Sequence, residues 1–97
     1  MDLVDSTSKR IDNNHRASFD LIADILETSR GGVKKTYLMN HCNLSFVQLK
    51  YYLDFVLKKG LLFIAAKDVD LNHGLFETTD KGKEFLKIYN RLKALLE

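Results

Sequence analysis

Cysteine is almost absent from this sequence, as are long apolar runs and paired metal-ligand motifs. Cys42 is the only cysteine among the 97 residues, so an intrachain disulfide is excluded. No CxxC or HExxH spacing occurs, which leaves no recognisable metal or redox motif. No apolar run approaches the roughly 20 residues that cross a bilayer, and the opening residues MDLVDSTSKR lack the apolar centre of a secretory signal. We therefore expect a cytoplasmic protein with no membrane partner.

Charge is small in sum but uneven along the chain. The formal net charge is +2, and the size and 45% hydrophobic content suit one globular domain with a modest core. Residues 17–29 carry three acidic and no basic residues, whereas residues 30–60 carry six basic residues against Asp54. This asymmetry fits either a surface for a polyanion or an ordinary solvated lysine-rich face.

Apolar spacing predicts two helices in the first half of the chain. The first begins near Ser18, its expected N-cap, and ends at Gly31-Gly32. The residues expected to face inward recur at three- and four-residue steps: Phe19, Ile22, Ala23, Ile25 and Leu26. A shorter helix follows over about residues 34–42, with Tyr37, Leu38 and Cys42 facing inward. Asn43 suits the left-handed conformation that often ends a helix.

The stretch NLSFVQLKYYLDFVLKKGLL, residues 43–62, contains clear start and stop signals for a third helix. Ser45 and Gln48 have the spacing of a capping box, and Gly60 suits the residue after a helix end. At 100° per residue, one broad stripe is apolar: Phe46, Leu49, Tyr52, Leu53, Val56 and Leu57. Phe55 falls outside this stripe and is a candidate partner contact.

After Gly60 the pattern changes to a hairpin and a last helix. LLFIAA and LFETT are β-prone and flank the turn material KDVDLNHG. Thr79 then caps a helix from about Asp80 to Leu96. Gly82, in the first turn of this helix, is expected to let the helix approach the hairpin closely because it has no Cβ. The order helix, helix, helix, hairpin, helix predicts a mainly α fold with a β-hairpin.

The short Asn43-Leu44 link predicts a helix-turn-helix, in which one helix supports the next as its N-terminal end enters a major groove. The hairpin is then positioned as the wing of a winged helix. Candidate base-contacting residues at the start of the third helix are Ser45, Val47, Gln48, Lys50 and Tyr51. Candidate phosphate contacts in the preceding helix are Lys34, Lys35 and Thr36. Helix-turn-helix geometry also occurs in proteins that never bind DNA, so the motif alone does not decide the function.

The run GGVKKTYLMNHCNLSFVQLKYYLDFVLKKGLL, followed by TDKGKEFL, resembles an archaeal winged helix-turn-helix family. That family includes the ten-kilodalton dimeric DNA-binding chromatin proteins and related small transcription regulators. The recurring features are Lys35-Thr36, Leu38-Met39, Asn43-Leu44-Ser45, Tyr52-Leu53, Gly60-Leu61 and Thr79-Asp80-Lys81-Gly82. The match spans roughly residues 16–90. It implies a winged-helix fold, double-stranded DNA as ligand, and a homodimer joined through the last helix.

Two departures from that family limit the expectation. The last helix has apolar residues for only about two heptads, which favours a compact dimer over a long antiparallel coiled coil. The candidate dimerisation residues are Phe85, Ile88, Tyr89, Leu92, Leu95 and Leu96. The wing turn carries Asp68 and Asp70 against Lys67 and His73, which is a poor surface for a phosphate backbone.

Neither a metal centre nor an active site is predicted. His41 and Cys42 are adjacent on a helix and diverge by about 100°, and no fourth ligand accompanies them and His73 at a recognisable spacing. No nucleophile motif supports either histidine as an acid-base group, so we expect no enzyme and no cofactor. Cys42 is expected to be a small core residue.

The prediction is a nucleoid-associated, dimeric DNA-binding protein that is a transcription regulator or chromatin component, either sequence-preferring or general. Residues 1–15 would form a flexible arm, residues 16–79 the winged helix-turn-helix domain, and residues 80–97 the dimerisation helix. An alternative is a protein-interaction module that uses Phe55 and the last helix to bind another regulator without DNA contact. A single-stranded nucleic-acid binder is a third possibility, but the interleaved aromatic and basic strands of such platforms are missing.

Overall fold

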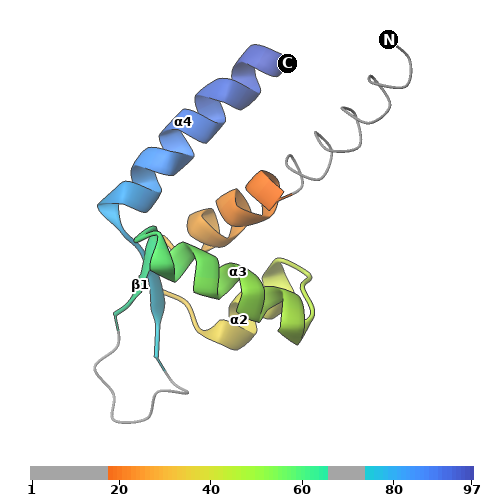
Figure 1. Ribbon diagram of the computed structural model, residues 1–97, viewed down its shortest axis with the longest axis vertical. Helices are drawn as coiled ribbons and strands as arrows, with labels where there is room; N and C mark the ends of the chain where they lie inside the picture. Colours follow the sequence, from red (N-terminus) through yellow and green to blue (C-terminus); the bar gives the residue numbers. More distant parts are fainter. Residues whose placement is uncertain (1–17, 66–73) are drawn as a thin grey trace.

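The computed structural model describes residues 18–65 and 74–97, and these contain the predicted elements in the predicted order (Figure 1). The elements are a helix over residues 18–28, α2 (Lys35–His41), α3 (Phe46–Lys58), β1 (Leu62–Ile64), β2 (Phe76–Thr78) and α4 (Asp80–Leu96). The predicted arm at residues 1–15 lies outside the described residues, as does the wing turn with Lys67, Asp68, Asp70 and His73. The prediction of a mainly helical winged fold is confirmed.

A single core joins all of these elements. Its fully buried side chains come from the first helix, α2, α3, β1 and α4: Ile25, Leu26, Leu38, Leu49, Val56, Leu62 and Leu86. Removing such side chains from water is the main favourable term in folding. Figure 1 shows α2 and α3 at one end of the molecule and the C-terminal half of α4 at the other. The core therefore holds the helix-turn-helix at one end, away from the last turns of α4.

Four expectations about the helices were wrong. Ser18 lies within the first helix instead of capping it, and its hydroxyl is 3.4 Å from that of Tyr52. Phe19, Tyr37 and Phe46, all expected to face inward, are each at least half exposed. Phe19 lies one turn before the buried residues of its helix, and Phe46 is the first residue of α3. For these three aromatic residues, helical periodicity gives the direction of the side chain from the helix axis but not how much of it neighbouring elements cover.

The hairpin contacts both the first helix and α3. β1 pairs with β2 in antiparallel register, with Leu62 opposite Thr78, and an isolated bridge joins Val33 to Phe76. The Thr78 hydroxyl donates a hydrogen bond to the carbonyl oxygen of Leu26. These contacts place the hairpin beside the helix-turn-helix, where the wing was expected.

The start of α4 packs tightly against the hairpin. Thr79 caps the helix by accepting a hydrogen bond from the Gly82 N–H at 3.0 Å, and its hydroxyl donates to the Gly60 carbonyl oxygen at 2.6 Å. A Cβ on Gly82 would overlap the carbonyl oxygen of Leu61 and the methyl group of Thr78. The predicted role of Gly82 in close approach is therefore confirmed.

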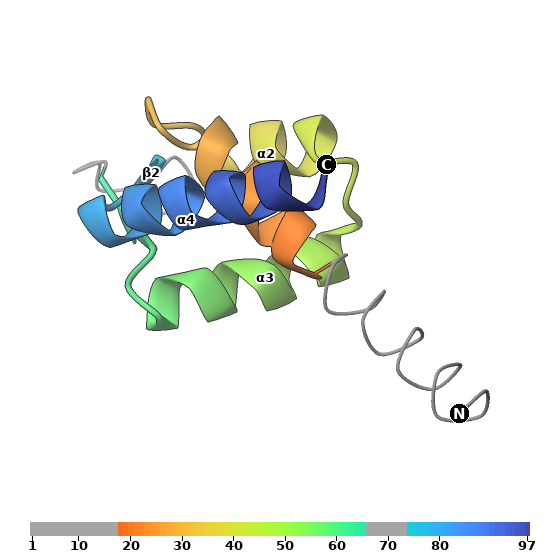
Figure 2. The same cartoon turned by 90° about the horizontal axis from the view of Figure 1, so that it is seen from above.

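From this start, α4 runs beside the first helix, as both views of the molecule show (Figures 1 and 2). The Tyr89 hydroxyl donates a hydrogen bond to the Asp20 carboxylate and so joins the two helices. Residues 91–97 are all exposed. The last turns of α4 thus extend beyond the part of the domain that packs on them.

Candidate nucleic-acid interface

The turn between α2 and α3 has the geometry expected of the Asn43-Leu44 link. Asn43 takes a left-handed conformation with φ of 55°, and the Leu44 N–H donates to the Met39 carbonyl oxygen at 3.0 Å. Leu44 itself is buried, which anchors the turn to the core. Leu49 and Val56 hold α3 from its inner side, so the residues on the opposite side of its first two turns face solvent.

The start of α3 is fixed by the predicted capping box. The Ser45 hydroxyl oxygen accepts from the Gln48 backbone N–H at 3.1 Å, and the Gln48 side-chain oxygen accepts from the Ser45 backbone N–H at 3.0 Å. Both residues are exposed, as a base contact requires. However, the Ser45 hydroxyl oxygen and the Gln48 side-chain oxygen already accept hydrogen bonds from backbone N–H groups at the start of the helix. The side-chain amide nitrogen of Gln48 has no such role in the helix.

Val47 and Tyr51 are the most exposed apolar side chains of α3. They stand one turn apart, and their side chains are 75% and 68% exposed. The Tyr51 ring packs edge-on against that of Tyr52, with centroids 5.2 Å apart and an interplanar angle of 86°. Tyr52 is half-buried against the core. The Tyr51 ring is therefore supported on one side while its other side is open to solvent.

Basic side chains lie beside this face. The Lys35 amine sits over the Phe46 ring, 4.8 Å from its centroid, so the start of α2 meets the start of α3. Lys50 is exposed on α3 itself. Phe55, predicted to lie outside the core stripe, is exposed, and the Lys59 amine lies 5.8 Å from its ring centroid.

Lys34 and Thr36 border a depression of about 460 Å³ between the start of α2 and the hairpin. Both side chains are exposed. The other lining residues are Gly32, Val33, Tyr37, Asn40 and Leu75. The Tyr37 ring stacks on that of His41, with centroids 5.5 Å apart. The candidate phosphate contacts therefore fall into two places, with Lys35 beside α3 and Lys34 with Thr36 towards the hairpin.

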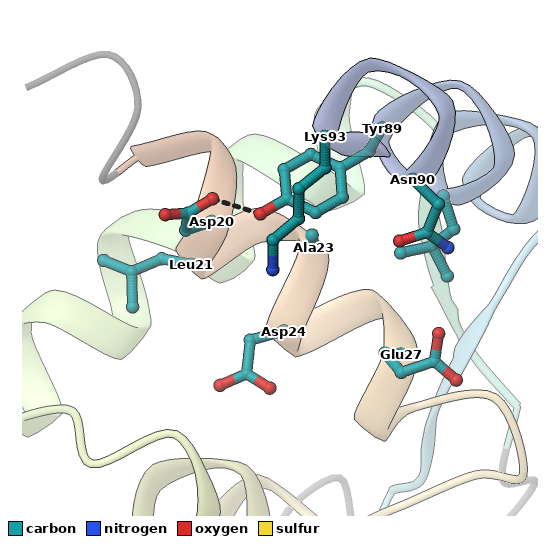
Figure 3. Close-up of a pocket in the computed structure, with 9 residues that line it drawn as sticks. Asp20, Leu21, Ala23, Asp24, Glu27, Tyr89, Asn90 and Lys93 are labelled. Atoms are coloured by element: carbon teal, nitrogen blue, oxygen red, sulfur yellow. Dashed lines mark hydrogen bonds between the residues drawn. The ribbon is translucent and has the colours of Figure 1, made fainter. Parts of the chain in front are cut away.

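A second depression, of about 420 Å³, lies between the first helix and α4 (Figure 3). Asp20, Asp24 and Glu27 come from the first helix, facing Tyr89 and Lys93 of α4. Burial, followed by the hydrogen bond to Asp20, raises the pKa of Tyr89 to about 12. Three carboxylates make this depression unfavourable for a phosphate group. Sequence reasoning missed the Tyr89 contact because the two residues are 69 positions apart and carry no local signal.

The six candidate dimerisation residues divide into two groups. Phe85 and Tyr89 are half-buried against their own domain and stack with centroids 6.3 Å apart. The other four are exposed by more than half: Ile88, Leu92, Leu95 and Leu96. Phe85 and Tyr89 thus fix α4 on the domain, and the four exposed residues leave an apolar stripe facing solvent.

The described residues contain neither a cluster of metal ligands nor a helix that could cross a membrane. Residues 18–65 and 74–97 contain no group of three or more His, Cys, Asp or Glu side chains that could hold a metal ion. Cys42 is buried, as expected, and this burial together with the nearby Asp24 raises the pKa of its thiol to about 11. In the part of the chain that the structure describes, no helix has the length and apolar content to cross a bilayer.

Solved structures similar to this chain share its fold at low sequence identity. Sso10a-2, a DNA-binding protein from Sulfolobus solfataricus, is 22% identical with a TM-score of 0.69, over 79% of this chain and 78% of that one. NMB1585, a MarR family regulator from Neisseria meningitidis, is 14% identical with a TM-score of 0.63, over 97% and 74%. A MepR mutant from S. aureus, bound to an oligodeoxyribonucleotide, is 11% identical with a TM-score of 0.61, over 81% and 60%.

No curated protein matches the chain significantly. A family model described as winged helix-turn-helix matches residues 15–97, which confirms the resemblance drawn from the sequence. The capped third helix, the left-handed turn before it and the hairpin after it are the parts of the structure that give this fold its name. The chain belongs to the winged helix-turn-helix family.

Proposed function

We propose that this protein binds double-stranded DNA as a small dimeric transcription regulator or chromatin protein. The observation that carries this proposal is the exposed outer face of the first two turns of α3. This face is held by a buried inner side and flanked by Lys35 and Lys50. A major groove about 12 Å wide admits one helix.

Phosphate contacts would come from the start of α2. Lys34 and Thr36 are exposed, and the Lys35 amine lies beside the first turn of α3. Cations placed beside an inserted helix fix its orientation without reading sequence. All five base contacts predicted from the sequence are exposed at the start of α3: Ser45, Val47, Gln48, Lys50 and Tyr51.

Two of the similar solved structures support a DNA ligand. Sso10a-2 is named as a DNA-binding protein, and the MepR mutant is bound to an oligodeoxyribonucleotide. We propose the same ligand for this chain, which shares their fold.

Dimerisation would use the exposed stripe of α4. Ile88, Leu92 and Leu95 follow one another at steps of four and three residues, so they share one side of the helix. Pairing with a second copy about a two-fold axis would remove this apolar surface from water. The dimer would present two copies of α3 to the two half-sites of one duplex.

A salt titration of duplex affinity, measured by fluorescence anisotropy, tests the proposal. Replacing both Lys34 and Lys35 with alanine is expected to weaken binding to all duplexes and to reduce the salt slope by about 2, since each phosphate contact contributes about 0.9. The matched control replaces Lys83 and Lys87, two exposed lysines of α4, and should keep the original slope. An absence of duplex binding at low salt, or an equal loss in both double variants, overturns the assignment.

A winged-helix protein-interaction module is the second candidate function. The exposure of Phe55 and of the α4 stripe favours it, because large exposed apolar surfaces mark interaction sites. A stable complex with another regulator, combined with no duplex affinity at low salt, would select this function over DNA binding.

A further inference from the structure

We infer that α3 recognises the methyl groups of thymine through Val47 and Tyr51, and that Gln48 positions the helix start without reading a base. This inference rests on the proposed DNA binding and names the feature of the duplex that gives it sequence preference. The exposed residues at the start of α3 form two groups. In one, polar atoms already accept hydrogen bonds from the helix backbone; in the other, the side chains present apolar surface to solvent.

The capping box restricts what Gln48 can offer to DNA. A glutamine that reads adenine uses its side-chain oxygen as acceptor and its amide nitrogen as donor together. Here the oxygen accepts from the Ser45 backbone N–H at 3.0 Å. Turning the amide towards a base would leave that N–H without its partner at the helix start. Gln48 therefore serves the geometry of α3, and its amide nitrogen alone does not distinguish adenine from guanine, since both present the N7 acceptor.

Val47 and Tyr51 have the opposite character. Val47 is 75% exposed, more than any other apolar side chain of α3, and Tyr51 follows it one turn later. Leu49 and Val56 hold the inner side of the helix, so the outer side is free to approach a groove. Among the groups that bases display in the major groove, the thymine methyl is the apolar one. An apolar face at the groove-facing end of a recognition helix therefore matches thymine better than it matches other bases.

The surroundings of this face favour a nucleic acid over an apolar protein surface. The Lys35 amine lies 4.8 Å from the centroid of the ring of Phe46, the residue before Val47 in the chain, and Lys50 is exposed on the same helix. A duplex places phosphates on both sides of the bases, so it supplies anions where these amines lie. The Tyr51 ring is also supported edge-on by Tyr52, which limits the entropy lost when it packs on a methyl group.

The test compares two duplexes of the same A·T-rich sequence, one with thymine and one with deoxyuridine in its place. Deoxyuridine keeps the hydrogen-bonding edge and the charge of thymine but lacks the C5 methyl. The thymine duplex is expected to bind about fourfold more tightly for each methyl contacted, which is the effect of burying one methyl-sized apolar group. Affinities are measured at one salt concentration, where the phosphate contribution is common to both duplexes.

Three variants assign the effect to residues. Val47→Ala should reduce the thymine preference, and Tyr51→Ala should reduce it as well, whereas Gln48→Ala should leave the ratio of the two affinities unchanged. Val47 is exposed, so its replacement is not expected to disturb folding, which circular dichroism can verify. Equal affinity of the unsubstituted protein for both duplexes, or a ratio unaffected by Val47→Ala, overturns methyl recognition while leaving DNA binding intact. Failure to bind either duplex at low salt overturns the proposed function itself.

Discussion

The Ser45 hydroxyl and the Gln48 side-chain oxygen each accept a hydrogen bond from the other residue's backbone N–H, at 3.1 and 3.0 Å. This exchange occurs at the end of α3 that is proposed to enter DNA. The same two side chains therefore stabilise the helix start and would also have to supply the polar groups that contact bases. We therefore expect the base preference of α3 to depend on Val47 and Tyr51.

Replacing Ser45 with alanine should lower the free energy of unfolding by about 1 kcal/mol, because the Gln48 N–H loses its acceptor at the helix start. Ser45→Asp keeps an acceptor at this position and should retain most of the stability. Urea unfolding followed by circular dichroism measures both variants. If Ser45→Ala unfolds at the same urea concentration as the unsubstituted protein, the capping box contributes nothing in solution.

Gly82→Ala should destabilise the protein, although alanine is the better helix former. The added Cβ meets the Leu61 carbonyl oxygen and the Thr78 methyl group, and crowding of this kind costs about 1–3 kcal/mol, against a gain of about 1 kcal/mol from helix propensity. Gly31→Ala is the matched control, because a Cβ at Gly31 meets no atom within 4 Å. Thermal unfolding of both variants is the measurement, and a stabilised Gly82→Ala variant would show that α4 and the hairpin are not in close contact.

Cys42 should make the protein sensitive to alkali between about pH 9 and 11. Burial, followed by the nearby Asp24, raises the pKa of the thiol from 9.0 to about 11, so the folded state keeps a proton that the unfolded state releases. The resulting stability is fully present below pH 9 and is lost as the pH rises through 11. Urea midpoints across this range should fall more steeply for the unsubstituted protein than for Cys42→Ala. Parallel pH profiles would show that the thiol is not buried in solution.

The α4 stripe should control the oligomeric state. Leu92→Glu combined with Leu95→Glu is expected to convert a dimer to a folded monomer, because charges would replace apolar side chains that pair with a second copy. Ala94→Glu adds a charge in the same exposed turn but on the other side of the helix, and should leave the dimer intact. Sedimentation equilibrium gives the masses. Equal masses for the unsubstituted protein and the double variant would remove the dimer from the proposal.

Local sequence signals predicted where helices start, end and approach the hairpin, because each signal depends on residues close together in the chain. Ser45 with Gln48 gave the start of α3, Gly60 gave its end, and Gly82 gave the close approach of α4 to the hairpin. Exposure was predicted less well. Phe19 and Phe46 follow the apolar period of their helices, yet at least half of each side chain is exposed.

Contacts between distant residues gave no signal in the sequence. The hydrogen bond from Tyr89 to Asp20 and the position of the Lys35 amine over Phe46 depend on how whole helices pack. The sequence predicted both roles of Gln48, in the capping box and as a base contact, without deciding between them. The spacing that makes it a capping residue also places it on the exposed start of α3, and only the hydrogen bond to Ser45 distinguishes the two roles.

A nitrogen-15 and proton correlation NMR titration with duplex DNA tests whether the start of α3 faces the duplex, because it reports binding residue by residue. The predicted result is that amide signals shift over residues 34–36 at the start of α2 and residues 45–51 at the start of α3. Signals of the first helix that line the acidic depression, such as Asp24 and Glu27, should stay in place. Shifts confined to the first helix and α4, with α3 unaffected, would show that the start of α3 does not contact DNA.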